Sequence, residues 1–166
     1  VVKQLSSIED EYKGVRQGTG VADNRYSTHS QTTVTTASKI IVMSAAEVWF
    51  LRAEAALRYN TGDDVENCYK QGVTVSFAQW DANGVSDYLE SDDRPAAYVD
   101  VFDAKFNADA PSTITPKWDN TADKEEKLER IITQKWLALY PEGCEAWAEQ
   151  RHTGYPRLIK VAVNNS

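Results

Sequence analysis

The chain has 166 residues and a mass of 18.6 kDa, with 42% hydrophobic residues and an aromatic set that includes five Trp and eight Tyr. This apolar and aromatic content predicts a folded chain with a sizeable core and excludes general disorder. The net charge of −7 and the pI near 4.9 argue against a nucleic-acid partner, because phosphate binding depends on clustered Lys and Arg.

Residues 1–43 form a polar segment, rich in Thr, Ser and Gly, that predicts loop. The piece "GTGVAD" lacks the third Gly and the strand-helix context of a dinucleotide site. Because the chain opens "VVKQLSS" without a start Met or a signal peptide, we expect the natural N-terminus to be missing.

Residues 44–80 are predicted to form an antiparallel pair of helices. The first runs from a capping box at Ser44 and Glu47 to about Tyr59, and its apolar residues recur on two faces, so we expect it to be packed on both sides. The second covers 64–80, and we expect its N-cap at Asp63.

Gly72 lies in the middle of this second helix, where glycine costs about 1 kcal/mol relative to alanine. Such a cost indicates close packing of another helix at this point.

Residues 81–121 form a long loop-rich insertion with Gly, Pro, Asp and Ser and only short apolar pieces, including "AAYVDVFDAKF", which has some helical character. Connections of this length are usually functional or mobile. Aromatic rings on such loops can stack on the apolar faces of sugars or bind partners. The insertion carries Tyr88, Tyr98, Phe102, Phe106 and Trp118.

Residues 122–154 predict a second helix pair, followed by a tail at 155–166. The third helix covers about 122–140 and ends at Pro141, and the fourth ends at Gly154 because Pro156 prevents its continuation. We expect Trp136 and Trp147 to lie in the core. Two helix pairs of this size suggest an α-solenoid element.

Catalytic and metal chemistry find little support in the sequence. Cys68 and Cys144 are far apart and the chain has two His, which gives no zinc pattern, and we interpret both cysteines as buried thiols rather than a disulfide. Glycoside hydrolysis needs two carboxylates, and an acidic loop offers several, although a solvated loop is the simpler interpretation. The acidic residues are Asp81, Asp87, Glu90, Asp92 and Asp93.

Three stretches together resemble the SusD/RagB family of outer-membrane nutrient-binding lipoproteins of Bacteroidetes. They are "MSAAEVWFLRAEAALR", "YKQGVTVSFAQW" and "EKLERIITQKWLALYPEGCEAWAEQRHTGYPRL", in this order. The resemblance covers about residues 38–80 and 122–158. It implies a mainly α fold of TPR-like antiparallel helix pairs with long irregular loops, and it makes the chain a single partial domain about a third of the usual length.

The resemblance also implies a function. Members of this family are lipid-anchored on the outer face of the outer membrane, are not enzymes, and deliver oligosaccharides or polysaccharides to a TonB-dependent transporter. We therefore expect glycan binding with no cofactor and no metal. The helix pairs would be scaffold, and the sugar contacts would fall in 81–120 or 21–36. Our candidates for sugar stacking are Tyr98 and Trp118, followed by Tyr88.

Two other functions stay open at this point. A helical-repeat scaffold would bind a peptide or the transporter without touching sugar. A glycosidase would use the carboxylates of the insertion.

Overall fold

The computed structural model describes residues 14–19, 26, 30, 34–38 and 40–163. The chain divides into two compact units. The helical unit consists of Ile40–Pro95 and Ser112–Arg157, and the loop unit consists of Val1–Lys39, Ala96–Pro111 and Leu158–Ser166. Candidate sugar-contact residues 21–25, 27–29 and 31–33 lie outside the described part. The single-domain organisation stays a prediction.

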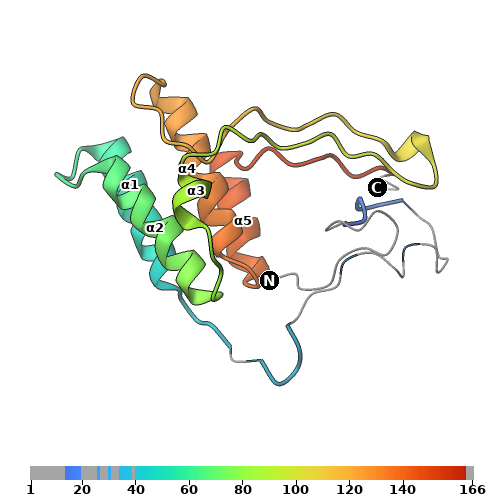
Figure 1. Cartoon of the computed structure of the whole chain (residues 1–166), viewed down its shortest axis with the longest axis horizontal. Helices are drawn as coiled ribbons and strands as arrows, with labels where there is room; N and C mark the ends of the chain where they lie inside the picture. Colours follow the sequence, from blue (N-terminus) through green and yellow to red (C-terminus); the bar gives the residue numbers. More distant parts are fainter. Residues whose placement is uncertain (1–13, 20–25, 27–29, 31–33, 39, 164–166) are drawn as a thin grey trace. The chain divides into compact units, whose positions relative to one another are not determined.

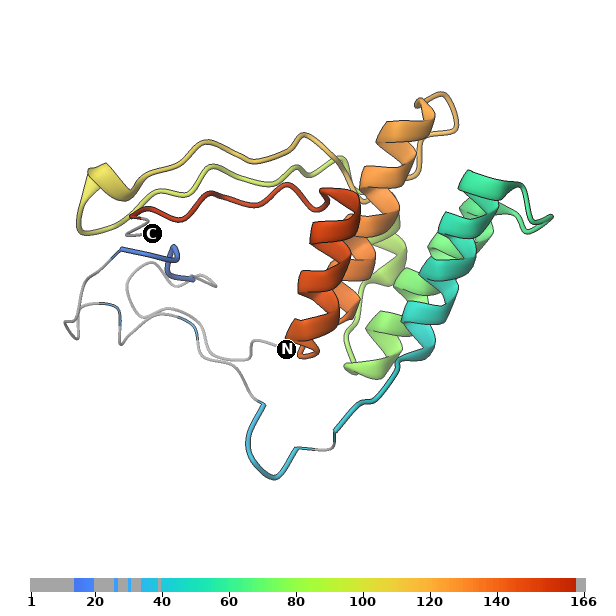
Figure 2. The same cartoon turned by 180° about the vertical axis from the view of Figure 1, so that it is seen from behind.

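The helical unit is built from two pairs of antiparallel helices. Figures 1 and 2 show α1 and α2 side by side, α4 next to them, and α5 beside α4. The bounds are Ala45–Tyr59 for α1, Val65–Gln79 for α2, Val85–Leu89 for α3, Lys124–Ala138 for α4 and Gly143–Thr153 for α5. Within the described residues the extended pairing is limited to one isolated bridge. The mainly α fold with long irregular loops is therefore confirmed.

The predicted insertion contains more structure than its composition indicates. The short helix α3 was not predicted. The segment "AAYVDVFDAKF", for which some helical character was expected, holds only a 3-10 turn at Ala104–Phe106 (η2).

The N-cap of α2 differs from the prediction by one residue. Asp64 caps the helix, because its Oδ1 accepts a hydrogen bond from the backbone N–H of Asn67 at 2.8 Å. Asp63 is instead held by Arg52 of α1, whose Nε and Nη2 donate to the carboxylate at 3.0 and 2.6 Å. The prediction of Asp63 as the cap was wrong because this long-range pair takes its carboxylate.

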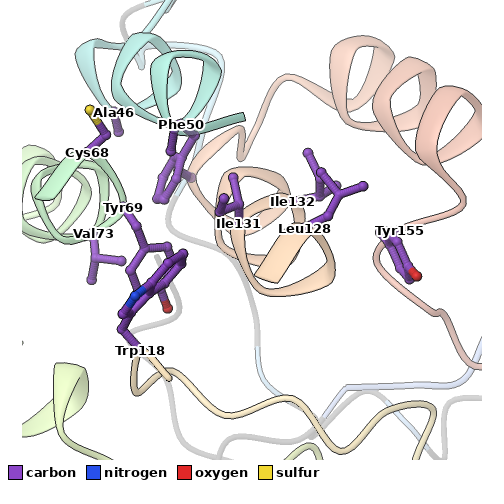
Figure 3. Packing of buried hydrophobic residues seen from close by; sticks show 12 residues of the cluster. Ala46, Phe50, Cys68, Tyr69, Val73, Trp118, Leu128, Ile131, Ile132 and Tyr155 are labelled. Carbon is purple, nitrogen blue, oxygen red and sulfur yellow. The ribbon is translucent and has the colours of Figure 1, made fainter. Parts of the chain in front are cut away.

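The core of the helical unit lies where α1, α2 and α4 meet. Phe50 of α1, Tyr69 of α2 and Ile131 of α4 expose none of their surface. Two further members come from outside the helices, namely Trp118 and Tyr155, and Figure 3 shows the ring of Trp118 against that of Tyr69. The segments expected to be an insertion and a tail thus each contribute a side chain to the hydrophobic core.

Helix α1 buries one face only. Ala46, Phe50 and Ala53 are buried, whereas Val48, Leu51 and Tyr59 are exposed. The expectation of packing on both sides is not met in this chain, because α2 and α4 both contact the face that carries Phe50.

Helix α5 likewise buries less than its sequence suggests. Its buried residue is Glu149, whose Oε2 forms an ion pair with Nζ of Lys135 on α4. Trp147 lies two positions away, on another face of the helix, and is 64% exposed, with the Arg151 guanidinium 5.1 Å from its ring centre. The predicted core position of Trp147 was therefore wrong.

Two other burial predictions hold only in part. Trp136 of α4, expected in the core, is half-buried. Cys68 is buried and Cys144 is exposed, both as free thiols. The first turn of α5, which carries Cys144, has no buried residue.

Within the loop unit, the side chain of Arg16 holds three segments together. Its Nη1 donates to the carbonyls of Phe106 and Asn107 at 2.9 Å each, and its Nε and Nη2 donate to the carbonyl of Lys160 at 3.0 and 2.8 Å. One guanidinium therefore connects three segments that are far apart in the sequence.

Gly72 is required by the approach of α1 to α2. A Cβ at this position would lie 2.7 Å from Cε1 and Cζ of Phe50. We expect Gly72→Ala to lower the free energy of unfolding by about 1–2 kcal/mol, because overpacking costs more than the gain in helix propensity. Urea denaturation measures the change. Gly143→Ala in α5 is the control, since a Cβ there meets nothing within 4 Å and is expected to be neutral or stabilising. Equal effects of both substitutions would contradict the packing argument.

Candidate ligand-binding site

A cavity of about 460 Å³ opens in the helical unit, within the size range of small-molecule sites. Its walls come from two stretches of the predicted insertion and from α4. The lining residues are Asp92, Arg94, Thr113, Thr115, Lys117, Trp118, Asp119, Asn120, Glu126 and Arg130.

The lining is polar and electrically balanced. It carries three carboxylates and three basic groups, together with two threonine hydroxyls, one amide and one indole. The cavity wall therefore contains both hydrogen-bond donors and hydrogen-bond acceptors. Such a surface suits a polar ligand that both donates and accepts hydrogen bonds and has little net charge.

The wall formed by 112–120 is anchored to α2 and α4. Ser112 Oγ donates to Glu129 Oε1 at 2.6 Å, and Tyr69 Oη donates to the carbonyl of Pro116 at 2.5 Å. Burial raises the pKa of Tyr69, so its hydroxyl keeps the proton that it donates. At the C-terminal end of this wall, Lys127 Nζ of α4 donates to the carbonyl of Asn120 at 2.8 Å. These bonds hold the loop as a preformed wall.

Arg130 connects the loop wall with the helix wall. Its side chain is 3% exposed, its Nε donates to the carbonyl of Thr115 at 3.1 Å, and its Nη2 donates to Glu126 Oε1 at 3.1 Å. Its Nη1 is buried and has no hydrogen-bond partner among the described residues. A residue that lines the cavity thus keeps one buried donor unused.

Trp118 forms the boundary between this cavity and a second one of about 300 Å³, which also shares Asn120. Its Nε1 donates to Asn120 Oδ1 at 3.0 Å, and Asn120 Nδ2 donates to Glu66 Oε2 at 2.9 Å. The indole is only 8% exposed and its ring centre lies 5.1 Å from that of Tyr69. The structure thus leaves little of the Trp118 indole open to a ligand. Its role in sugar stacking stays a prediction.

The other two candidate rings do not line the cavity. Tyr88 is half-buried on α3, where its hydroxyl bonds the side-chain amide of Gln134 at 2.8–3.0 Å and its ring packs on Phe77. Tyr98 belongs to the loop unit, and its hydroxyl donates to Asp100 Oδ2 at 3.0 Å. Their ligand roles also stay predictions.

Of the predicted acidic residues, Asp92 lines the cavity, whereas Asp81, Asp87, Glu90 and Asp93 do not. The pKa of Asp119, another lining carboxylate, is lowered by hydrogen bonds from the side chain and backbone of Thr121. A general acid for glycoside hydrolysis needs a raised pKa, so Asp119 is unsuited to that role.

The part of the chain that the structure describes contains no helix that is both long and apolar enough to cross a bilayer. Nor does it bring together three or more His, Cys, Asp or Glu side chains in a group that could hold a metal ion.

Most of the residues that line the cavity were not singled out from the sequence. Glu126 and Arg130 sit on α4 at i and i+4, a spacing that is equally typical of a solvated helix surface. Lys117 and Asn120 lie in a loop without a motif. Of the stacking candidates only Trp118 lies in the cavity wall.

Fold and cavity together define a helix-pair scaffold with a polar cavity between its connecting loops and α4. Comparison with known families is more specific. The chain belongs to the SusD-like family, described as "Susd and RagB outer membrane lipoprotein", whose model matches residues 2–166. The match therefore includes the insertion and the first residues, beyond the segments that carried the resemblance. This description confirms the outer-membrane lipoprotein localisation at the level of the family.

Solved structures give the same result. A SusD homologue from Bacteroides vulgatus is 43% identical with a TM-score of 0.87, and covers 98% of this chain and 35% of its own. A SusD homologue from Bacteroides thetaiotaomicron is 41% identical with a TM-score of 0.87, over 94% of this chain and 34% of its own. A chitin-binding SusD homologue from Flavobacterium johnsoniae is 40% identical with a TM-score of 0.90, over 99% of this chain and 35% of its own.

The chain thus spans about a third of the length of these solved relatives. No protein among the curated sequences matches it.

Proposed function

We propose that the chain binds an oligosaccharide or polysaccharide in the cavity of about 460 Å³, which is lined by Asp92, Arg94, side chains from residues 113–120 and α4. The observation that carries the proposal is the balanced lining, which combines three carboxylates and three basic groups with two hydroxyls, an amide and Trp118. Family membership and the chitin-binding relative support it.

The physical match is with the hydroxyl groups of sugars. Each sugar hydroxyl donates one hydrogen bond and accepts others. A surface that offers both donors and acceptors can therefore bind successive hydroxyls of a glycan in several orientations. Charged partners such as Asp92 and Arg94 strengthen these bonds. Because the charges cancel, a neutral glycan enters without an unbalanced electrostatic cost.

The cellular role extends the proposal to the whole protein. We propose that it is lipid-anchored at the outer face of the outer membrane and passes its glycan to a TonB-dependent, SusC-like transporter. Binding is proposed to occur without chemistry, so no reducing sugar is released from the bound glycan.

The binding site is tested by substitutions in the cavity wall with matched controls outside it. We expect Asp92→Ala and Arg94→Ala each to weaken oligosaccharide binding about tenfold or more, because each removes a charged hydrogen-bond partner. Isothermal titration with chitotriose, cellotriose and maltotriose measures the affinity. Asp87→Ala and Arg151→Ala make the same charge changes at exposed positions away from the cavity and are expected to have no effect.

Two outcomes would contradict the proposal. If no glycan of a wider panel binds the full chain, glycan binding itself is refuted. If glycans bind and all four variants retain wild-type affinity, the site lies elsewhere, and Tyr98 and Tyr88 become the next positions to substitute.

A second function has one observation in its favour. Val48, Leu51 and Tyr59 form an exposed apolar face on α1, which suits a helical-repeat scaffold that binds protein rather than sugar. Capture of a purified SusC-like transporter by a chain that retains no glycan would favour this alternative. Charged substitutions at Val48 and Leu51 would then abolish the capture.

A further inference from the structure

A second cavity opens beside the proposed glycan site, in the same helical unit. Its volume is about 300 Å³, at the lower end of the range for small-molecule sites. Trp118 and Asn120 line both cavities, so the two lie side by side. The rest of its wall comes from the C-terminal turn of α1, the N-terminal end of α2 and the first turn of α4. These residues are Leu57, Asp64, Val65, Glu66 and Lys127.

Asn120 separates the two cavities at the surface. Trp118 is only 8% exposed whereas Asn120 is exposed, so a molecule that extends from one cavity into the other passes over the Asn120 side chain. The amide of Asn120 donates to Glu66 Oε2 at 2.9 Å and accepts from Trp118 Nε1 at 3.0 Å. A primary amide has two donor hydrogens and two acceptor lone pairs, so Asn120 has the capacity to bind a ligand hydroxyl as well.

The second cavity differs from the first because part of its wall is aliphatic. Leu57 and Val65 provide this part, and carboxylate, amine and amide groups provide the rest. A sugar ring has the matching surfaces, with C–H groups on its faces and hydroxyls around its edge. Its faces can therefore pack on the two aliphatic side chains while its hydroxyls bond to the polar groups.

The charges of the second cavity are also compensated. The carboxylate of Glu66 pairs with Nζ of Lys70 at 2.7 Å, and Lys127 supplies a positive charge to set against Asp64. Neither cavity thus carries a large charge of one sign. A neutral chain that leaves the first cavity meets no electrostatic barrier in the second.

We propose that the second cavity is a further subsite for the same glycan, and that the bound chain passes over Asn120 and occupies both cavities. The inference rests on the proposed function and extends it to the length of the ligand. The protein then selects longer glycan chains over short ones of the same sugar and linkage.

The test compares each trisaccharide with the hexasaccharide of the same series, using chito-, cello- and malto-oligosaccharides. A hexasaccharide offers several three-unit stretches to a single cavity, which by itself raises the affinity about fourfold. Contacts in the second cavity add to this factor. We therefore expect the hexasaccharide to bind about twentyfold or more tighter than the trisaccharide in isothermal titration on the full chain.

Variants assign the length dependence to the second cavity. Val65 is half-buried at the first position of α2, and Val65→Arg places a long side chain in this cavity. We expect it to lower the hexasaccharide-to-trisaccharide affinity ratio to about fourfold. Asn67→Arg makes the same charge change at an exposed position on the first turn of α2, outside both cavities, and is expected to leave the ratio at its wild-type value.

A third variant separates the two cavities. Arg94→Ala, in the first cavity, is expected to weaken the trisaccharide and the hexasaccharide by the same factor and to leave their ratio unchanged. A general loss of structure in Val65→Arg would likewise weaken both ligands together, whereas a blocked subsite lowers the ratio itself.

Several results would overturn the inference. A wild-type ratio of about fourfold or less would refute it without any variant, so it does not depend on the variants folding. A high ratio that Val65→Arg leaves unchanged would show that the longer chain runs elsewhere. If no oligosaccharide of either length binds, the proposed function itself is refuted.

Discussion

Lys135→Ala is expected to lower the free energy of unfolding by about 3–5 kcal/mol, because it leaves a buried carboxylate without its counter-charge. Lys135 is 2% exposed, and its Nζ pairs with Oε2 of Glu149, which is 6% exposed. The second oxygen of Glu149 is already buried without a partner among the described residues. After the substitution neither oxygen has a cationic partner. Urea denaturation followed by far-UV circular dichroism measures the loss.

Two controls separate burial from charge. Lys70→Ala breaks the Lys70–Glu66 pair on the surface of α2 and is expected to cost about 0.5 kcal/mol or less. The double substitution of Lys135→Met with Glu149→Leu removes both charges and is expected to recover most of the lost stability. A cost below about 1 kcal/mol for Lys135→Ala would contradict a buried, uncompensated charge.

The long helices follow directly from local sequence. The Ser44 cap accepts from the backbone N–H of Glu47 as the capping box predicts, and α5 ends at Gly154, which adopts φ 79. These features are local, because a cap and a helix stop depend on neighbours within about four residues. Caps and stop signals therefore predict where the long helices begin and end to within about two residues.

What periodicity does not predict is which apolar residues find a partner. Val48 and Trp147 have the spacing of core residues, yet both are exposed. The buried position on α5 is the charged Glu149, whose burial depends on a lysine 14 residues away in the sequence. Burial is decided by helix-on-helix contacts, and these are not encoded in the pattern of a single helix.

Only the loop walls of the cavity lie where ligand contacts were expected from the sequence. Ligand contacts were expected in residues 81–120 or 21–36, and Asp92, Arg94 and side chains from residues 113–120 line the cavity of about 460 Å³. That a ligand binds there stays a prediction. The helix wall of the cavity was not predicted, because Arg130 meets the loop through the carbonyl of Thr115, a contact that no residue type specifies. Backbone carbonyls are present at every position, so sequence alone does not show which one an arginine binds.

Trp118→Ala is expected to lower the free energy of unfolding by about 3–5 kcal/mol and to abolish chitotriose binding at the same time. The indole is 8% exposed, packs against Tyr69 and bonds Asn120 at the end of the loop wall. Its removal leaves a void in the core and releases the wall of the cavity. Loss of binding in this variant therefore does not by itself demonstrate stacking.

Trp118→Phe separates the two roles. Phenylalanine keeps an aromatic ring in the core but loses the Nε1 donor to Asn120, so we expect a cost of about 1–2 kcal/mol and partial retention of binding. Urea denaturation and isothermal titration on the same preparations give both quantities. An exposed stacking ring would behave differently: Trp118→Ala would leave the free energy of unfolding within about 0.5 kcal/mol of wild type while binding is lost. That result would place the indole in the ligand site and remove it from the core.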